Sequence, residues 1–348
     1  MSKGNINYKY LRRRKSWIER NWKGLLIIIA LLLVIGGGLT YGAIKLAQNG
    51  GFSFLAGSDD GNDNKSNDVQ EQTTQAREVN WIVDKEPEST EVNYTAPAGV
   101  ELPYYIKVNR AANCVTVYGI DAEGNYSIPV RAFAASCGRE GQETITGENY
   151  TTTDKYLWRL MVDGTYGHYA FRIYGGYLFH SVPYLGASSD TLETAEYNKL
   201  GSFASLGCVR MCVRDVYWLY ENCPEGTKVD IYDDETNPGP LGKPESIKIP
   251  LDSEYAGWDP TDIDEGNPWK NSKAEITGAK DITAKIGEKV DILKGVTAVD
   301  TCGNDISDDI YTVGRYTFDQ VGEYDIKYGV VDAIGSKAEV TVKLKVTE

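Results

Sequence analysis

An uncharged run of 21 residues, from Gly24 to Ile44, constrains this chain more than any other part of its sequence. As an α-helix the run would be roughly 31 Å long, enough to cross the hydrocarbon core of a bilayer. Residues 1–23 carry eight Lys or Arg and one Glu, and the positive-inside rule places such a tail in the cytoplasm. A cleaved signal peptide is the alternative, but its apolar part usually has only about 7–15 residues. The sequence therefore predicts a cytoplasmic basic tail over 1–23, a single-pass membrane helix over 24–47 and export of the rest.

Charge and composition exclude several classes of function. The formal net charge is −14 and the basic tail contributes +7, so the remainder carries −21 and we expect no nucleic-acid partner. The two histidines show neither HExxH nor paired CxxC spacing, and there is no Gly-rich phosphate loop in the exported part. We therefore expect neither a metal nor a cofactor. Six cysteines in an exported chain permit disulfides, but the sequence selects no pairing and gives no oligomeric state.

The exported part divides into a tether, two domains and a connector. Residues 48–100 are polar and aperiodic, which predicts a flexible tether. Strand-like runs at 105–108, 114–118 and 127–133 then begin a β-rich domain over 101–233. A proline-rich, weakly periodic connector is expected over 234–272, before a second β domain over 273–348. The predicted fold class is therefore mainly β, with an N-terminal transmembrane helix.

A β-hairpin is expected around Gly175-Gly176, because this two-glycine break separates two strand-like runs. In the simplest pairing Phe171 faces His180. Side chains alternate across a strand, so His180 should share a face with Phe171 while the other histidine, His168, points the opposite way. Of the two histidines, only His180 is then expected to lie close to Cys208.

Two helices are expected in the second half of the β-rich domain. Asp190 and Glu193 form a capping-box-like start to a short helix that Gly201 would end. A second helix is predicted over 213–222, and the run at 229–232 is typical of a closing strand.

The last 76 residues, 273–348, favour a separate β domain without helices. Strict alternation over 340–346 predicts a strand with one buried face. Gly303-Asn304-Asp305-Ile306, Val321-Gly322-Glu323-Tyr324 and Val331-Asp332-Ala333-Ile334-Gly335 resemble the immunoglobulin-like modules of bacterial surface proteins. This resemblance implies a β-sandwich.

One cysteine stands among small residues in Ser205-Leu206-Gly207-Cys208-Val209-Arg210-Met211, and His180-Ser181 lies upstream of it. A thiol attacks a carbonyl as thiolate, so it needs a base, a positive environment and donors for the oxyanion. This pattern predicts a cysteine acyl-transfer site.

Together with Thr144-Ile145-Thr146-Gly147, this pattern makes residues 102–233 resemble the L,D-transpeptidase catalytic domain. The matched positions are His180, Ser205, Gly207, Cys208 and Arg210. In that family the cysteine attacks the L-centre to D-Ala amide of a peptidoglycan tetrapeptide stem, releases D-Ala and passes the acyl group to an acceptor amine. The resemblance implies a 3-3 crosslinking enzyme of cell-wall organisation and cell shape, with stem peptides as donor and acceptor.

The nucleophile and its base are the central site residues. Cys208 is the expected nucleophile, its pKa lowered from about 8.5 by His180 and by the N-terminal end of the following helix. His180 is the expected base, held in its tautomer by the main-chain carbonyl of Ser181. The family usually carries His at the position of Leu206 and Pro at that of Ile145, which puts acceptor handling or rate in question.

Three further residues are expected to position the substrate. The N–H groups of Gly207 and Cys208 are expected to bind the oxyanion, since glycine lets the backbone approach closely. Arg210 either binds a stem-peptide carboxylate or braces the loop through carbonyl groups. Ser205 is grouped with them because it matches the family pattern.

Two other functions compete with crosslinking. An L,D-carboxypeptidase would form the same acyl-enzyme and use water as acceptor. A non-catalytic wall-binding or scaffold protein is the other alternative, with Leu206 marking loss of the site.

Overall fold

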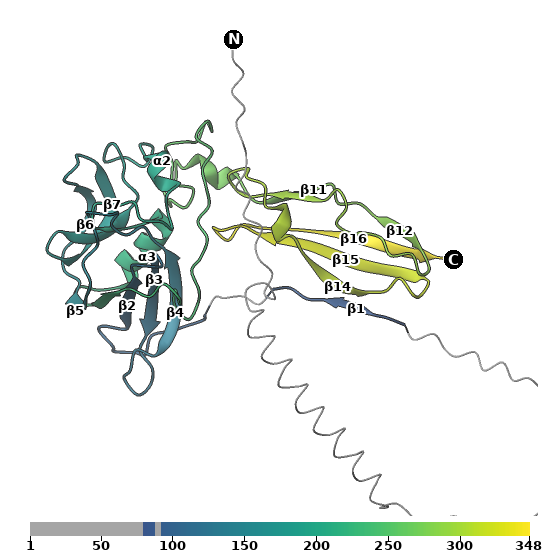
Figure 1. Ribbon diagram of the computed structural model, residues 1–348, viewed down its shortest axis with the longest axis horizontal. Helices are drawn as coiled ribbons and strands as arrows, with labels where there is room; N and C mark the ends of the chain where they lie inside the picture. The colour runs from purple at the N-terminus through teal and green to yellow at the C-terminus, as the bar shows by residue number, and fades with distance from the viewer. Residues whose placement is uncertain (1–78, 88–91) are drawn as a thin grey trace, which may run out of the picture. The chain divides into compact units, whose positions relative to one another are not determined.

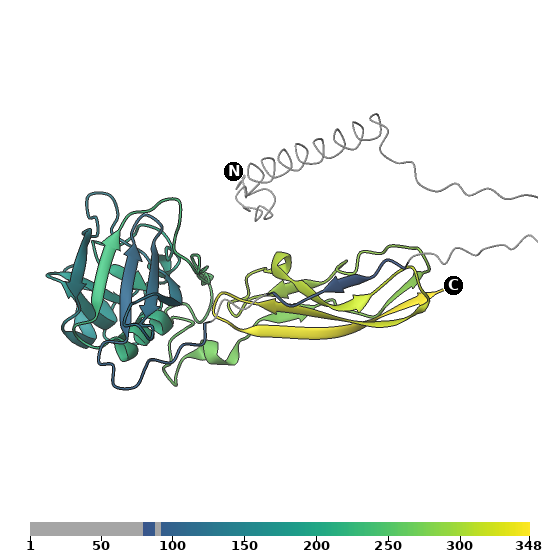
Figure 2. The same ribbon diagram turned by 90° about the horizontal axis from the view of Figure 1, so that it is seen from below.

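The computed structural model describes residues 79–87 and 92–348, which are built mainly of β-strands (Figures 1 and 2). The predicted basic tail, the membrane helix over 24–47 and most of the tether lie outside the described residues. Within the described ranges, no helix is long and apolar enough to span a bilayer.

Between residues 104 and 232, all of which are described, the β-rich domain has nine strands and two helices. They are β2 (Tyr104–Asn109), β3 (Cys114–Gly119), β4 (Ile128–Ala134), β5 (Gly147–Thr151), β6 (Lys155–Leu160), β7 (Tyr166–Tyr174), β8 (Tyr177–Ser181), α2 (Thr194–Tyr197), β9 (Val209–Met211), α3 (Val213–Asn222) and β10 (Lys228–Tyr232). The predicted first three strands are confirmed as β2, β3 and β4, and the closing strand as β10.

These strands form two sheets, in the orders β4-β3-β2-β10-β5 and β6-β7-β8-β9. Alternate residues of paired strands are buried, as the β pattern predicts: Ile106 and Val108 on β2, and Val229 and Ile231 on β10. β10 runs parallel to β2 and antiparallel to β5. The second sheet places β8 and β9 next to each other, and this pairing builds the candidate site.

Helix α3 packs against both sheets, beside β7 in Figure 1. Val213, Val216 and Leu219 recur at helical spacing and are fully buried. On the other side the Trp218 ring lies edge-on to Tyr104 of β2, with centroids 5.2 Å apart. The predicted range of 213–222 is confirmed.

Helix α2 is much shorter than predicted. It begins after Glu193, and its last residue is Tyr197. The side chain of Asp190 does not cap it, because that carboxylate accepts a hydrogen bond from Ser188 Oγ instead. Gly201 still marks a left-handed position, with φ of +89°.

The hairpin of β7 and β8 is confirmed, but its predicted register is wrong. Phe171 faces Phe179 rather than His180, because the register shifts between Arg172 and Tyr174. A bulge of this kind moves every later side chain by one position. His180 therefore does not share a face with Phe171.

The expected connector over 234–272 is largely part of the β-rich domain. Ile247, Ile249 and Trp269 are each at most 5% exposed and join the same core as α3. Asp259 accepts a hydrogen bond from the N–H of Val213 at 2.8 Å. A carboxylate at the first turn of a helix satisfies an unpaired N–H and complements the helix dipole.

The C-terminal domain has a five-stranded sheet in the order β1-β14-β15-β16-β12 and a pair, β11-β13. The 3₁₀ turn η1 (Pro268–Asn271) ends the segment over 234–272 that packs on the β-rich domain. Besides β1 (Ile82–Asp84), the C-terminal domain contains β11 (Glu275–Thr277), β12 (Ile282–Lys285), β13 (Thr297–Val299), η2 (Ser307–Asp309), β14 (Tyr311–Tyr316), β15 (Gly322–Val331) and β16 (Lys337–Thr347). The long strands lie side by side in Figures 1 and 2. The short 3₁₀ turn η2 is the one departure from the expected absence of helices among these described residues.

Strand β1 (Ile82–Asp84) falls within the predicted tether, so the tether range of 48–100 is wrong at these residues. β1 pairs antiparallel with β14, and Ile82 lies opposite Tyr316. The segment is also held by its side chains: Asp84 accepts a hydrogen bond from Thr312 Oγ1 at 2.7 Å, and Trp81 lies under the Arg315 guanidinium. The β-rich domain is thus inserted, in sequence, between two strands of one sheet.

All six cysteines are free thiols. Cys208 is half-buried, whereas the other five are buried. The disulfide between Cys208 and Cys212 that would block the predicted nucleophile is not formed.

Candidate active site

Cys208 and His180 belong to neighbouring segments of the second sheet, with His180 on β8 and Cys208 just before β9. β8 and β9 pair in parallel, with Phe179 opposite Val209 and His180 opposite Arg210. Cys208 directly precedes β9, so it shares a face of the sheet with Arg210 and His180. Arg210 lies opposite His180, so Cys208 stands two residues before the direct neighbour of the histidine.

The Cys208 thiol is protonated at rest. Its Sγ–H donates to the carbonyl of Gly176 at 3.7 Å. Burial raises the pKa of the thiol above its ordinary value, and the Leu178 backbone and the Arg210 charge only partly oppose this. The expected lowering by a helix N-terminus is wrong, because β9 intervenes and α3 begins only at Val213.

The His180 imidazole is neutral at rest. Its residue is 2% exposed, and burial, followed by the positive charge of Arg210, lowers the pKa of His180 from 6.5 to about 3. Its Nδ1 has no hydrogen-bond partner among the described residues. The pair therefore rests as thiol and neutral imidazole rather than as thiolate and imidazolium.

Ser205 fixes the backbone immediately before Cys208. Its Oγ–H donates to the carbonyl of Cys208 at 2.5 Å, and its Oγ accepts from the N–H of Gly207 at 3.0 Å. Because that N–H is already bonded, Gly207 is not free to bind an oxyanion, and this part of the expectation is wrong for the resting site. Gly207 has φ of +120°, and a Cβ there would lie 3.0 Å from the Tyr177 ring.

Arg210 braces the loop, which is one of its two expected roles. Its Nη1 donates to Glu196 at 2.8 Å and to the Ala204 carbonyl at 3.3 Å, and its side chain is 8% exposed. Its Nε is buried and has no hydrogen-bond partner in the described part of the chain. The guanidinium thus ties α2 to the segment before Cys208.

Ser181 faces away from the candidate pair. Its Oγ accepts from the N–H of His168 at 2.8 Å and donates to the Val182 carbonyl at 2.7 Å. The Ser181 side chain therefore holds two strands together, while its backbone favours the charged form of His180. The Ser181 side chain therefore points away from the imidazole, and the tautomer-holding role expected of its carbonyl stays a prediction.

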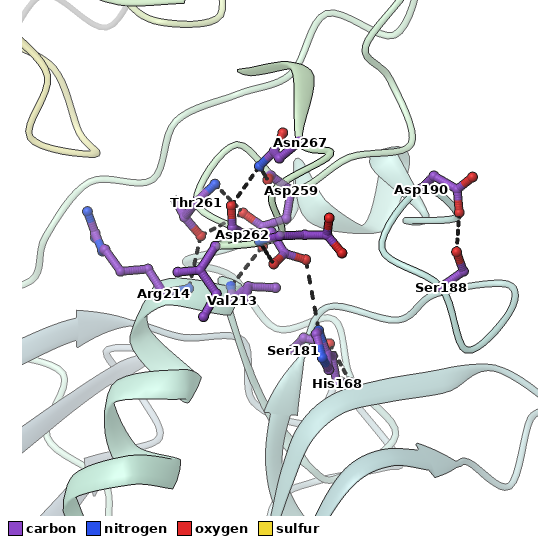
Figure 3. A network of polar contacts seen from close by, with 12 residues as sticks. His168, Ser181, Ser188, Asp190, Val213, Arg214, Asp259, Thr261, Asp262 and Asn267 are labelled. Carbon is purple, nitrogen blue, oxygen red and sulfur yellow. Dashed lines mark hydrogen bonds and ion pairs between the residues drawn. The ribbon is translucent and has the colours of Figure 1, made fainter. Parts of the chain in front are cut away.

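His168 belongs to a different buried network, drawn in Figure 3. Its ring stacks on Trp158 with centroids 3.9 Å apart, and its Nδ1 lies 3.9 Å from Asp262 Oδ2. Burial lowers the pKa of His168 from 6.5 to about 4. The left-handed backbone of Tyr169, with φ of +50°, interrupts the strand alternation between this histidine and the residues that follow.

Several contacts of the site were not predicted from the sequence. The Gly176 carbonyl and the Tyr177 ring come from the hairpin turn, next to Cys208 and Gly207. Asp163 stands in the turn between β6 and β7, and its charge acts on both Cys208 and His180. An Asp-Gly pair between two strands is a turn signal and could have located it.

An open groove of about 370 Å³ adjoins the segment that carries Cys208. Its lining residues are Arg110, Ala111, Gly138, Glu140, Glu143, Phe203, Asp233 and Glu235. Gly138 forms an isolated β-bridge with Ser205, which places the groove beside the loop that precedes Cys208. Among the described residues, no three His, Cys, Asp or Glu side chains are grouped as metal ligands.

Comparison with known protein families assigns both domains. A family model described as the L,D-transpeptidase catalytic domain matches residues 103–231, and one described as the Ig-like domain of bacterial surface proteins matches residues 274–346. A protein of Bacillus subtilis (strain 168) that carries the name L,D-transpeptidase YciB is 30% identical over 152 residues, covering 41% of this chain and 75% of that protein.

Solved structures are similar only over part of their length. An L,D-transpeptidase from Mycobacterium smegmatis is 18% identical, with a TM-score of 0.30 and coverage of 37% of this chain and 58% of that one. An L,D-transpeptidase from Mycobacterium tuberculosis H37Rv is 22% identical, with a TM-score of 0.29 and coverage of 38% and 58%. The chain thus spans a little over half of each of these structures.

Proposed function

Because the chain belongs to the L,D-transpeptidase family, we propose that it crosslinks peptidoglycan stem peptides with Cys208 as nucleophile. The donor is a tetrapeptide stem, the bond attacked is the L-centre to D-Ala amide, and the acceptor is the amine of a second stem. The observation that supports this proposal is the parallel pairing of β8, which carries His180, with β9, which begins directly after Cys208.

Proton transfer to His180 accompanies the attack rather than preceding it. The raised pKa of the thiol and the lowered pKa of the imidazole favour the neutral pair at rest. The thiol turns from Gly176 and gives its proton to the imidazole as the C–S bond forms and the carbonyl oxygen becomes negative. Collapse of this intermediate breaks the C–N bond, and the imidazolium returns the proton to the nitrogen of the departing D-Ala.

The second half-reaction reverses these roles. The acceptor amine attacks the thioester, a C–N bond forms, the C–S bond breaks, and the proton lost by the amine passes through His180 to the sulfur. Ser205 and Arg210 act by holding the loop, since both are bonded to its backbone. Leu206 cannot take a proton, which leaves His180 as the imidazole on this face of the sheet.

We also propose that residues 24–47 anchor the enzyme in the cell membrane, with the N-terminus in the cytoplasm and the catalytic domain outside. The uncharged run and the basic residues before it support this arrangement. The substrate would then be the nearby wall.

Product analysis on tetrapeptide-containing muropeptides tests the function. We expect the wild type to yield crosslinked dimer and D-Ala, and Cys208→Ala to yield neither. Tripeptide and D-Ala without dimer would identify a carboxypeptidase. No D-Ala from folded wild-type protein would contradict an enzymatic role.

A further inference from the structure

The turn between β6 and β7 is packed directly against the proposed base. The N–H of Met161 donates to the Thr165 carbonyl at 2.8 Å, which closes the turn over residues 161–165. Gly167 follows, and a Cβ at this position would lie 2.4 Å from Met161 Cε and 2.9 Å from His180 Nδ1. The absence of a side chain at Gly167 lets the turn and the imidazole approach each other closely.

Asp163 occupies this turn with its carboxylate fixed and exposed. Its Oδ1 accepts hydrogen bonds from the N–H and the Oγ1–H of Thr165, at 3.1 and 2.7 Å. Burial alone would raise the pKa of Asp163, but these hydrogen bonds and the Arg210 charge hold it below its ordinary value. The group is therefore ionised at neutral pH, and in the described part of the chain it makes no ion pair.

The charges near the site leave an excess of negative charge. Arg210 and Lys199 both pair with Glu196. Asp163 and Glu193 add two further carboxylates, and their charges act on each other. Of the charges that act on Cys208, Arg210 and Arg172 are already paired with Glu196 and Asp154. Asp163 is the exposed carboxylate that a cation can meet there.

We propose that Asp163 binds the ammonium group of the acyl acceptor and so favours amine over water in the second half-reaction. This inference rests on the proposed function. The amine is the cationic group that the reaction must bring to the thioester, whereas the D-Ala end of the donor carries a carboxylate that Asp163 repels.

The ammonium forms an ion pair with Asp163 and loses one proton to solvent as it leaves that pair. The free amine then attacks the thioester carbonyl, with formation of the C–N bond and cleavage of the C–S bond. Its second proton passes through His180 to the sulfur, which restores the thiol.

The test compares wild type, Asp163→Asn and a control, Asp190→Asn, in the full chain. Asp190 is also an exposed turn aspartate bonded to a hydroxyl two residues away, but its charge is not among those acting on Cys208 or His180. Thioester formation and D-Ala release report the first half-reaction. The ratio of dimer to tripeptide reports the choice of acceptor.

We expect Asp163→Asn to lower the dimer-to-tripeptide ratio about three- to fivefold at limiting acceptor, which matches the interaction free energy of an exposed charge pair. D-Ala release should not slow. The loss should shrink at high salt and vanish when hydroxylamine, which is largely uncharged at neutral pH, replaces the amine. An unchanged ratio, or an equal fall in Asp190→Asn, would overturn the inference while leaving the crosslinking function intact. Wild-type protein that releases D-Ala but forms no dimer would also overturn it, and absence of D-Ala would instead refute the function.

Discussion

At Cys208 and His180, burial sets the resting protonation state. The family motif locates both residues in the sequence, and the structure places His180 on β8 and Cys208 directly before the neighbouring strand β9. Their electrostatics could not be predicted in the same way, because the pKa of each group depends on which atoms cover it. The expected thiolate is replaced by a thiol that donates to Gly176.

Alkylation of Cys208 checks this state. Because the pKa of the thiol is raised, the rate of reaction with iodoacetamide should keep rising through pH 9, with no plateau near neutral pH. His180→Ala should show nearly the same pH profile, since the imidazole is already uncharged. Cys208→Ala gives the background from the buried thiols. A plateau by pH 7 in the wild type would mean that a thiolate forms at rest.

Elements with a local signal were predictable, and those fixed by distant partners were not. Alternation located β2, β3 and β4, and apolar spacing located α3. The register between Phe171 and Phe179 depends on a bulge that the sequence does not mark. The capping of α3 by Asp259 joins residues 46 apart in the chain, in a segment without periodicity.

The buried cap of α3 should make stability depend on pH. Burial raises the pKa of Asp259 to about 6 from 3.8, so between these values the folded state binds a proton that the unfolded state does not. The stability that protonated Asp259 contributes to the folded state is therefore fully present below about pH 4 and is lost as pH rises through 6. A shift of two units corresponds to about 3 kcal/mol at most.

Asp259→Asn tests this dependence because it removes the titration and keeps an oxygen that can accept from the Val213 N–H. Urea unfolding between pH 4 and 8 should show the variant gaining on the wild type as pH rises, by up to about 3 kcal/mol. Other carboxylates titrate in both proteins and cancel in the difference. Parallel curves for the two proteins would rule out a raised pKa at this position.

At the scale of the whole molecule, the two domain types were predictable from the sequence. The division of the immunoglobulin-like domain into two separate stretches of sequence was not. The immunoglobulin-like sheet takes β1 from before the catalytic domain, and Ile82 pairs with Tyr316 across 234 residues. Three residues of alternating exposure carry too little pattern to predict a strand. The β-rich domain is therefore joined, at both of its ends, to strands of one sheet.

Mapping the acyl-enzyme tests the central claim most directly. Rapid quenching with a tetrapeptide donor, followed by mass spectrometry of the digested protein, should find one acyl adduct, on Cys208. It should form in wild type and largely also in His168→Ala, whose histidine lies in the Asp262 network, but about a hundredfold or more slowly in His180→Ala. An adduct on another residue, or equal loss in both histidine variants with folding intact, would contradict the account.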